Sequence, residues 1–204
     1  MANLFVLEVL FLLQPATNTP LVCANTIQTL FNHIFETSFN TQLEGGADEP
    51  FYQPATDSAP AKILFRDDYV SSAMHEISHW VIAGKARRQL EDYGYWYEAD
   101  GRNFAQQKSF EQVEVKPQAV ELLLHYAAGM VFRVSVDNLA LPEYDSTPFK
   151  EAVYGQVKRY LDHRCHDSLP PRALSFIKAL TSYRNIELKD DAQLNLWLMQ
   201  AVAR

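Results

Sequence analysis

Two histidines and a glutamate in the stretch His75-Glu76-Ile77-Ser78-His79 have the types and the spacing of a metal-binding motif. Residues four apart lie on one face of a helix, so His75 and His79 can direct imidazole nitrogens at a single metal ion. Glu76 stands where H-E-x-x-H enzymes carry a general base rather than a ligand. The motif predicts a metal site with His75 and His79 as ligands and Glu76 as a catalytic residue.

The residues around the motif predict an amphipathic helix that is anchored in the core. Its apolar side chains recur at helical spacing on one face; they are Tyr69, Val70, Ala73, Met74, Ile77, Trp80 and Val81. Asp67 or Asp68 is the expected N-cap, and Gly84 is expected to end the helix. A short strand, 62–65, precedes this helix and would give it a stiff support.

A two-histidine site needs an acidic ligand from another element, and the segment from Ser109 to Gly129 offers candidates. We expect a helix that starts at Ser109 and is kinked or divided at Pro117, which lacks an N–H. The candidate third ligands are, in order of preference, Glu114, Glu111 and then Glu98 or Glu121.

Two histidines and one carboxylate are compatible with more than one kind of chemistry. They leave about half of an octahedral shell open, which suits Fe(II) that binds O2 and a substrate. They also make a catalytic zinc site, where bound water has a pKa of about 7 and Glu76 accepts its proton. From spacing alone a zinc hydrolase is the default, whereas a structural ion in a binding module would require a fourth protein ligand.

Composition predicts one globular domain and restricts its partners. The chain has 204 residues, of which 48% are hydrophobic and 12% aromatic, and we assign residues 25–204 to a single domain. Residues 1–24 are an expected N-terminal extension, whose apolar run is too short to span a bilayer and follows no basic residue. A net charge of −7 argues against direct nucleic-acid binding, and two cysteines fit a reducing compartment. With the apolar run too short to span a bilayer, we expect a cytoplasmic protein without a membrane partner.

Helical periodicity and capping signals predict a helix-rich chain with a small sheet. Helices are expected at 25–39, 147–161, 171–183 and 191–202, and short strands at 41–43, 51–52, 62–65 and 131–136. Asn25 with Gln28 has the spacing of a capping box, and Asp137-Asn138 is an expected turn near the site. The predicted fold class is therefore α+β, a single domain with the H-E-x-x-H helix in its core.

Two stretches after the histidine helix suit a substrate or a partner. Tyr95 and Trp96 lie in an aromatic turn and are candidates for a substrate wall, because amphipathic rings pack on an alkyl chain and keep a polar tip free. A basic run precedes this turn and consists of Lys85, Arg87 and Arg88. It lies one to three turns past the second histidine, at the approach to the expected ion.

Taken together, these motifs resemble the elongation factor P hydroxylase family. The resemblance is carried by residues 72–80, 82–88, 93–97, 100–102, 113–119, 137–139 and 176–180. It extends from about residue 25 to residue 183, and the first two dozen residues do not fit the family pattern. This combination is far more specific than the metal-binding pentad alone.

The resemblance implies a bacterial oxidoreductase that hydroxylates the β-lysylated lysine of elongation factor P. That protein is a translation factor that relieves ribosomes stalled on proline runs, and it would be both substrate and partner. Family members are not built like the 2-oxoglutarate oxygenases. The resemblance implies His75 and His79 as metal ligands, with Glu114 the best match for the acidic ligand, and it favours Fe(II) with O2 as co-substrate over zinc.

The remaining residues receive roles from this implied reaction. Glu76 would supply or relay protons, and Tyr95 and Trp96 would hold the aliphatic stem of the lysine. Glu111 would meet the ammonium groups of the substrate, and Arg102 is a further expected substrate contact. Because a lysyl substrate is cationic, the basic run is assigned to an acidic surface of the partner protein.

Overall fold

The computed structural model of the protein describes residues 20–94, 101–138, 144–162 and 164–202. Its sheet has the strand order β1–β3–β2 and is formed by β1 (Thr41–Ala47), β2 (Phe51–Gln53) and β3 (Ala61–Arg66). Strand β1 runs parallel to β3, and β2 runs antiparallel to it. The predicted fold class, a helix-rich α+β domain with a small sheet, is confirmed.

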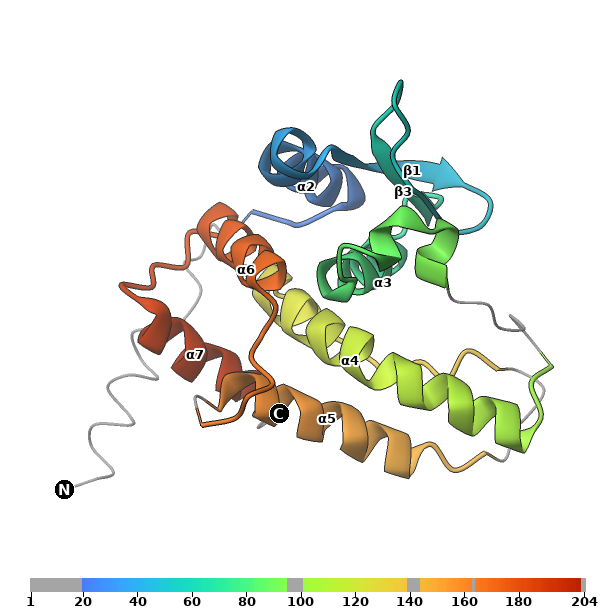
Figure 1. The fold of residues 1–204 in the computed structure, drawn as a ribbon. Helices are drawn as coiled ribbons and strands as arrows, with labels where there is room; N and C mark the ends of the chain where they lie inside the picture. The colour runs from blue at the N-terminus through green and yellow to red at the C-terminus, as the bar shows by residue number, and fades with distance from the viewer. Residues whose placement is uncertain (1–19, 95–100, 139–143, 163, 203–204) are drawn as a thin grey trace.

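Helices form most of the described structure. The α-helices are α2 (Ala24–Phe39), α3 (Val70–Ile82), α4 (Phe104–Ala128), α5 (Thr147–Leu161), α6 (Pro171–Tyr183) and α7 (Asp191–Met199); 3-10 helices cover Arg87–Gln89, Glu91–Gly94 and Gln200–Val202. Helices α2 and α3 contact each other and the sheet, which lies beside them at one end of the described structure (Figure 1). Helix α4 lies between α3 and α5 in Figure 1, and it also contacts α6 and α7. The long helix α4 is thus a common support for the other helices.

The apolar face of α3 is buried, as its periodicity predicts. Trp80 is fully buried, and its ring centroid lies 5.1 Å from that of Phe31 and 5.0 Å from that of Phe35, both on α2. Phe176 of α6 joins this cluster at 6.0 Å from Phe31. Such aromatic contacts add to the burial of apolar area and hold α3 against two other helices. The histidine side of the same helix is left to face α4.

The structure corrects the expected caps of two helices. The N-cap of α2 is Cys23, so Asn25 lies inside the helix and makes no capping box with Gln28. The Gln28 side chain instead accepts a hydrogen bond from the N–H of Gly45 in β1. Neither predicted aspartate caps α3, whose N-cap is Tyr69 without a side-chain hydrogen bond. The spacing of polar residues identified these helices but not their first residues.

Helix α4 begins more than one turn before the expected start at Ser109. Its first residue is Phe104, and Asn103 and Gln106 form a capping box in which each side chain accepts the backbone N–H of the other residue. The helix is also longer than expected, because it continues through Pro117 as a single element. Two capping signals were present in this stretch, and the earlier one defines the helix.

The predicted strand at 131–136 is wrong, although the segment alternates in side-chain exposure as an extended chain does. Its backbone pairs with side chains of α4 instead of a neighbouring strand. The Gln118 amide accepts the Ser135 N–H at 3.0 Å and donates to the Ser135 carbonyl at 2.8 Å. The Gln107 amide donates to the Val136 carbonyl at 2.9 Å. These two glutamines satisfy backbone groups that a strand partner would otherwise bond.

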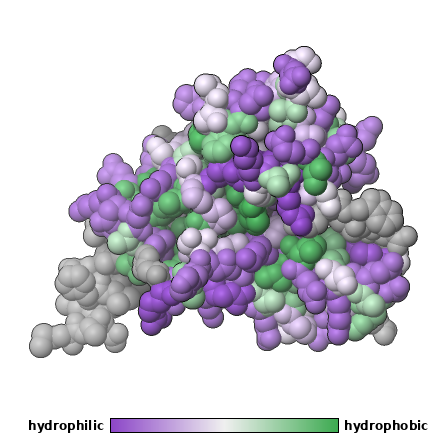
Figure 2. Space-filling view, viewed as in Figure 1, coloured by the Kyte–Doolittle hydropathy of each residue, from purple (hydrophilic) through white to green (hydrophobic). Residues whose placement is uncertain are grey.

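None of the described helices is long and apolar enough to cross a bilayer. Figure 2 shows hydrophilic side chains over most of one face, with apolar side chains in separate patches. Residues 1–19, most of the proposed N-terminal extension, lie outside the described residues.

We expect Trp80→Ala to reduce the free energy of unfolding by about 3–5 kcal/mol, because it empties the aromatic cluster that anchors α3. Urea denaturation followed by circular dichroism measures this loss. Leu196→Ala is the control, since that side chain is 56% exposed and its loss should change stability by less than about 0.5 kcal/mol. Equal stability of the two variants would contradict the anchoring role of Trp80.

Candidate metal centre

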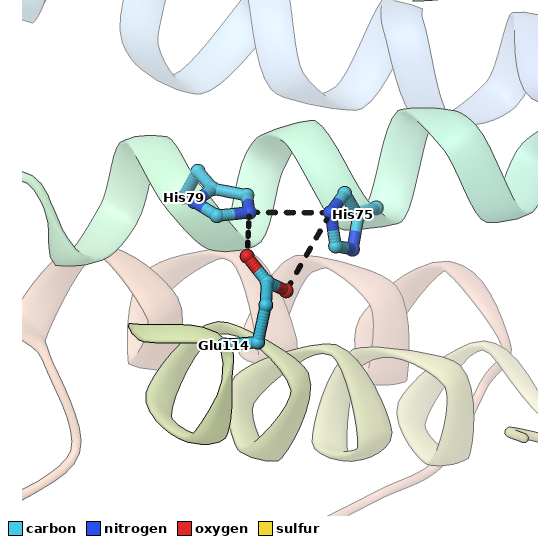
Figure 3. Close-up of side chains that lie close together, drawn as sticks. All are labelled: His75, His79 and Glu114. Atoms are coloured by element: carbon cyan, nitrogen blue, oxygen red, sulfur yellow. Dashed lines mark hydrogen bonds and ion pairs between the residues drawn. The ribbon is translucent and has the colours of Figure 1, made fainter. Parts of the chain in front are cut away.

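Three donor side chains from two helices meet between α3 and α4. His75 and His79 of α3 and Glu114 of α4 offer ligand atoms that all lie within 4.8 Å of one another. The Nε2 atom of His79 lies 3.2 Å from His75 Nε2 and 3.2 Å from Glu114 Oε1, and His75 Nε2 lies 3.8 Å from Glu114 Oε2. Figure 3 shows the three side chains pointing toward one another.

These spacings fit a single metal ion. Two ligand atoms about 2.1 Å from an ion lie about 3.0 Å apart at a right angle and about 3.4 Å apart at a tetrahedral angle. Three donors grouped on one side leave other coordination positions for water, O2 or a substrate. The side chain of His75 is 29% exposed and that of His79 is 12% exposed, so the group is accessible from solvent.

Glu114 is a buried carboxylate that its neighbours keep ionised; the residue is 1% exposed. Burial alone would raise its pKa. The charges of His79 and His75, with hydrogen bonds from His79 and Gln118, outweigh this effect and lower the pKa of Glu114 to about 2. The anionic form is the one that binds a metal ion, so this carboxylate is ready to act as a ligand.

The second ring nitrogen of His75 has its own acidic partner. Its Nδ1 lies 2.9 Å from Oε2 of Glu121, whereas its Nε2 faces His79 and Glu114. Burial would lower the pKa of His75, but the hydrogen bond to Glu121 and the charges of Glu121, Glu114 and Glu76 raise it to about 10. The raised pKa favours the imidazolium form of His75, and a metal ion at Nε2 would displace that proton.

The alternatives for the third ligand occupy different places. The carboxylate of Glu111 accepts a hydrogen bond from the Tyr144 hydroxyl at 2.9 Å and a longer one from Gln107 at 3.4 Å. Glu121 contacts the outer nitrogen of His75, and Glu98 lies outside the described residues. Of the three candidate carboxylates that the structure describes, Glu114 is the one that forms a group with both histidines.

Glu76 lies beside the histidines and is partly buried. Burial raises its pKa above the ordinary value, and the charges of His75 and His79 act in the opposite direction. Tyr93 adds an aromatic wall nearby, since its ring is nearly parallel to that of His79 at 6.3 Å and stacks on Tyr52 at 4.3 Å. Burial and the charge of Glu76 raise the pKa of Tyr93 well above its usual range, so its hydroxyl stays protonated.

Arg102 is buried, with 2% exposure, and its guanidinium is used within the protein. It stacks over the Phe110 ring at 3.9 Å and donates to the Gln107 side chain and to the carbonyls of Val136 and Asp137. These contacts tie the start of α4 to the extended segment that follows the same helix. The expected contact between Arg102 and a substrate stays a prediction.

The structure describes all three residues of the basic run. Arg88 is half-buried, lies 5.9 Å from the Trp80 ring centroid and donates to the Ala83 carbonyl, so it supports the end of α3. Arg87 donates to the Tyr93 carbonyl, and Lys85 is exposed. The proposed substrate wall, Tyr95 and Trp96, lies outside the described residues.

Sequence reasoning missed a polar stripe on α4. Its members are Gln107, Glu111, Glu114, Gln118, Glu121 and His125, and all except the half-buried Glu111 are buried. Their spacing alternates between four and three residues, which places them on one face of the helix. That spacing is visible in the sequence and would have linked Glu121 to Glu114 as a helical neighbour.

Comparison with known proteins assigns the chain to a family. A family model described as elongation factor P hydroxylase matches residues 30–194. The chain therefore belongs to the elongation factor P hydroxylase family. The elongation factor P lysine hydroxylase of Haemophilus influenzae is 50% identical over 169 residues, which are 82% of this chain and 92% of that protein. The resemblance to the elongation factor P hydroxylase family is confirmed, and the matched residues include the whole His75–His79–Glu114 group.

We expect Glu114→Ala to weaken metal binding by more than about 100-fold, beyond the effect usual for residues that only support a ligand. Competition with a chromophoric chelator, using Co(II) or Fe(II) without oxygen, measures the affinity. Glu111→Ala is the matched control from the same stripe and should keep the wild-type affinity. The assignment would be wrong if Glu111→Ala lost the ion and Glu114→Ala retained it.

Proposed function

We propose that this protein is a metal-dependent hydroxylase that adds one oxygen atom to the β-lysylated lysine of elongation factor P. Membership of the elongation factor P hydroxylase family and the name of the relative from Haemophilus influenzae support the substrate. The observation that carries the metal chemistry is the His75–His79–Glu114 group. Two histidines and a carboxylate on one side of an ion are the ligand set of non-haem Fe(II) oxygenases.

Fe(II) is the proposed metal, with O2 as co-substrate and without 2-oxoglutarate. The ion would be held by Nε2 of His75, Nε2 of His79 and the carboxylate of Glu114. Fe(II) in such a site would activate O2 so that one oxygen atom enters a C–H bond of the lysyl side chain. The second oxygen atom would leave as water, with two electrons from an external reductant and two protons.

The residues around the ligands would prepare this chemistry. Glu114 is ionised and the two histidines are held by a helix that is fixed in the core, so the ligand geometry exists before an ion binds. Glu76, next to His75, is assigned proton transfer at its carboxyl oxygen. Glu111 lies one turn from Glu114 and would attract the ammonium groups of the substrate. Tyr95 and Trp96 remain our candidates for holding its aliphatic stem.

Hydrolysis by a zinc-bound water is the second candidate, because the same ligands with an adjacent Glu76 occur in zinc hydrolases. It predicts tight zinc binding, no dependence on oxygen and loss of activity in Glu76→Gln. The family to which the chain belongs favours the hydroxylase.

Mass spectrometry of β-lysylated elongation factor P tests the proposed reaction. After incubation with Fe(II), O2, a chemical reductant and the wild-type protein, we expect the modified peptide to gain the mass of one oxygen atom. His75→Ala should give no gain, because the ion loses one of its three ligands. An unmodified peptide under reducing, iron-loaded conditions with the wild type would refute the hydroxylase, and a gain without O2 would refute the co-substrate.

Elongation factor P is the proposed partner, and the net charge of −7 gives no reason to propose direct contact with nucleic acid. A cytoplasmic location is proposed because a translation factor acts there. Within the basic run, Lys85 has the exposed side chain best suited to an acidic surface of the partner, since Arg87 and Arg88 also donate hydrogen bonds to backbone carbonyls of this chain.

We expect Lys85→Glu to raise KM for elongation factor P several-fold with little change in kcat, because it replaces an attractive charge by a repulsive one. Steady-state assays at two salt concentrations measure the effect, which should shrink at high salt. Lys150→Glu makes the same charge change at an exposed position of α5 and serves as control. A KM equal to that of the Lys150→Glu protein would show that Lys85 does not contribute to binding elongation factor P.

A further inference from the structure

Glu121 is a buried member of the polar stripe that belongs neither to the group of metal ligands nor to the residues that bond the extended segment. Its side chain is 10% exposed, and its Oε2 lies 2.9 Å from His75 Nδ1. His125, one turn later, does not compete for this oxygen, because its Nδ1 bonds the main-chain carbonyl of Glu121 at 3.0 Å. The Oε1 atom of Glu121 is 3.9 Å from that same His125 nitrogen. The carboxylate is thus aimed at His75.

The contact determines which nitrogen of His75 is available to an ion. A metal-bound imidazole carries one N–H, and an acceptor beside Nδ1 favours the form in which that hydrogen is on Nδ1 and the lone pair is on Nε2. The Nε2 atom is the one that faces His79 and Glu114. A hydrogen bond on the outer side of the ring also restricts its rotation.

We propose that Glu121 is a positioning residue of the metal centre, which accepts the Nδ1–H of His75 and keeps its Nε2 directed at the ion. The proposal rests on the metal site of the proposed function and goes beyond it, since Glu121 touches neither the ion nor the substrate. Glu114 and Glu121 stand two turns apart on α4, so one helix supplies a ligand and also orients a ligand of α3. Glu114 and Glu121 would therefore hold α3 and α4 together at two points.

Metal affinity tests this role independently of catalysis. In Glu121→Ala we expect affinity for Co(II) and Zn(II) to fall about 10–100-fold, the usual effect of removing the partner of a metal-binding histidine. Glu121→Gln should lie between this variant and the wild type, because its amide oxygen still accepts the Nδ1–H. Glu151→Gln makes the same charge change at an exposed position of α5 and should match the wild type.

A spectroscopic readout separates positioning from a merely structural effect. Histidine 15N NMR of the Zn(II)-loaded wild type should show a protected Nδ1–H on His75, which exchanges faster in Glu121→Ala. Thermal unfolding of the metal-free proteins shows whether each variant is folded. If Glu121→Ala does not fold, the comparison of Glu121→Gln with the wild type still tests the role.

Wild-type affinity and an unchanged Nδ1–H signal in both Glu121 variants would overturn this inference alone. Failure of the wild type to bind any of the metals would overturn it together with the proposed function. A loss of affinity in the Glu121 variants, with a wild type that binds iron but does not hydroxylate elongation factor P, would support the positioning role and refute the proposed reaction.

Discussion

The buried carboxylate of Glu114, which faces His75 and His79, is the main constraint on how the helices of this protein are arranged. Placing the charge of Glu114 in the interior costs several kcal/mol unless partners compensate it. His79, His75 and the Gln118 amide provide that compensation without an ion, and a bound cation would strengthen it. Because the histidines belong to α3 and the carboxylate to α4, these two helices must keep one relative position. The aromatic cluster around Trp80 and the contacts of α4 with α5, α6 and α7 hold that position.

The polar stripe of α4 extends the same principle along the helix. Buried polar groups are tolerated when each has a partner, and the stripe meets this requirement in two ways. Around Glu114 and Glu121 it faces the histidines of α3. At Gln107 and Gln118 it bonds the extended segment after α4, which also contacts the buried guanidinium of Arg102. In most globular proteins this buried side of α4 would be apolar. Here it carries polar side chains that face the candidate metal centre and bond the extended segment.

Local sequence patterns predicted the elements whose structure depends mainly on their own residues. Periodicity predicted α3, turn signals bounded the three strands of the sheet, and motif spacing predicted that His75 and His79 lie on one face of a helix. Prediction failed where tertiary partners decide, because the alternating residues 131–136 bond glutamine side chains rather than a strand. The sequence already placed Glu114 first among the candidate carboxylates, but the different role of Glu121 required the structure, since the two glutamates are chemically alike and differ in which nitrogen of His75 they face. Two signals in the sequence were overlooked: the four-three spacing of the stripe and the capping box of Asn103 and Gln106 at the start of α4.

A crystal structure of the protein loaded with Fe(II) in the absence of oxygen tests the central claim most directly. The account predicts one ion about 2.0–2.2 Å from His75 Nε2, His79 Nε2 and a Glu114 oxygen, with no fourth protein ligand. Glu121 should remain hydrogen-bonded to the Nδ1 of His75. An ion bound by Glu121 or Glu111 in place of Glu114, or a shell closed by a fourth side chain, would contradict it.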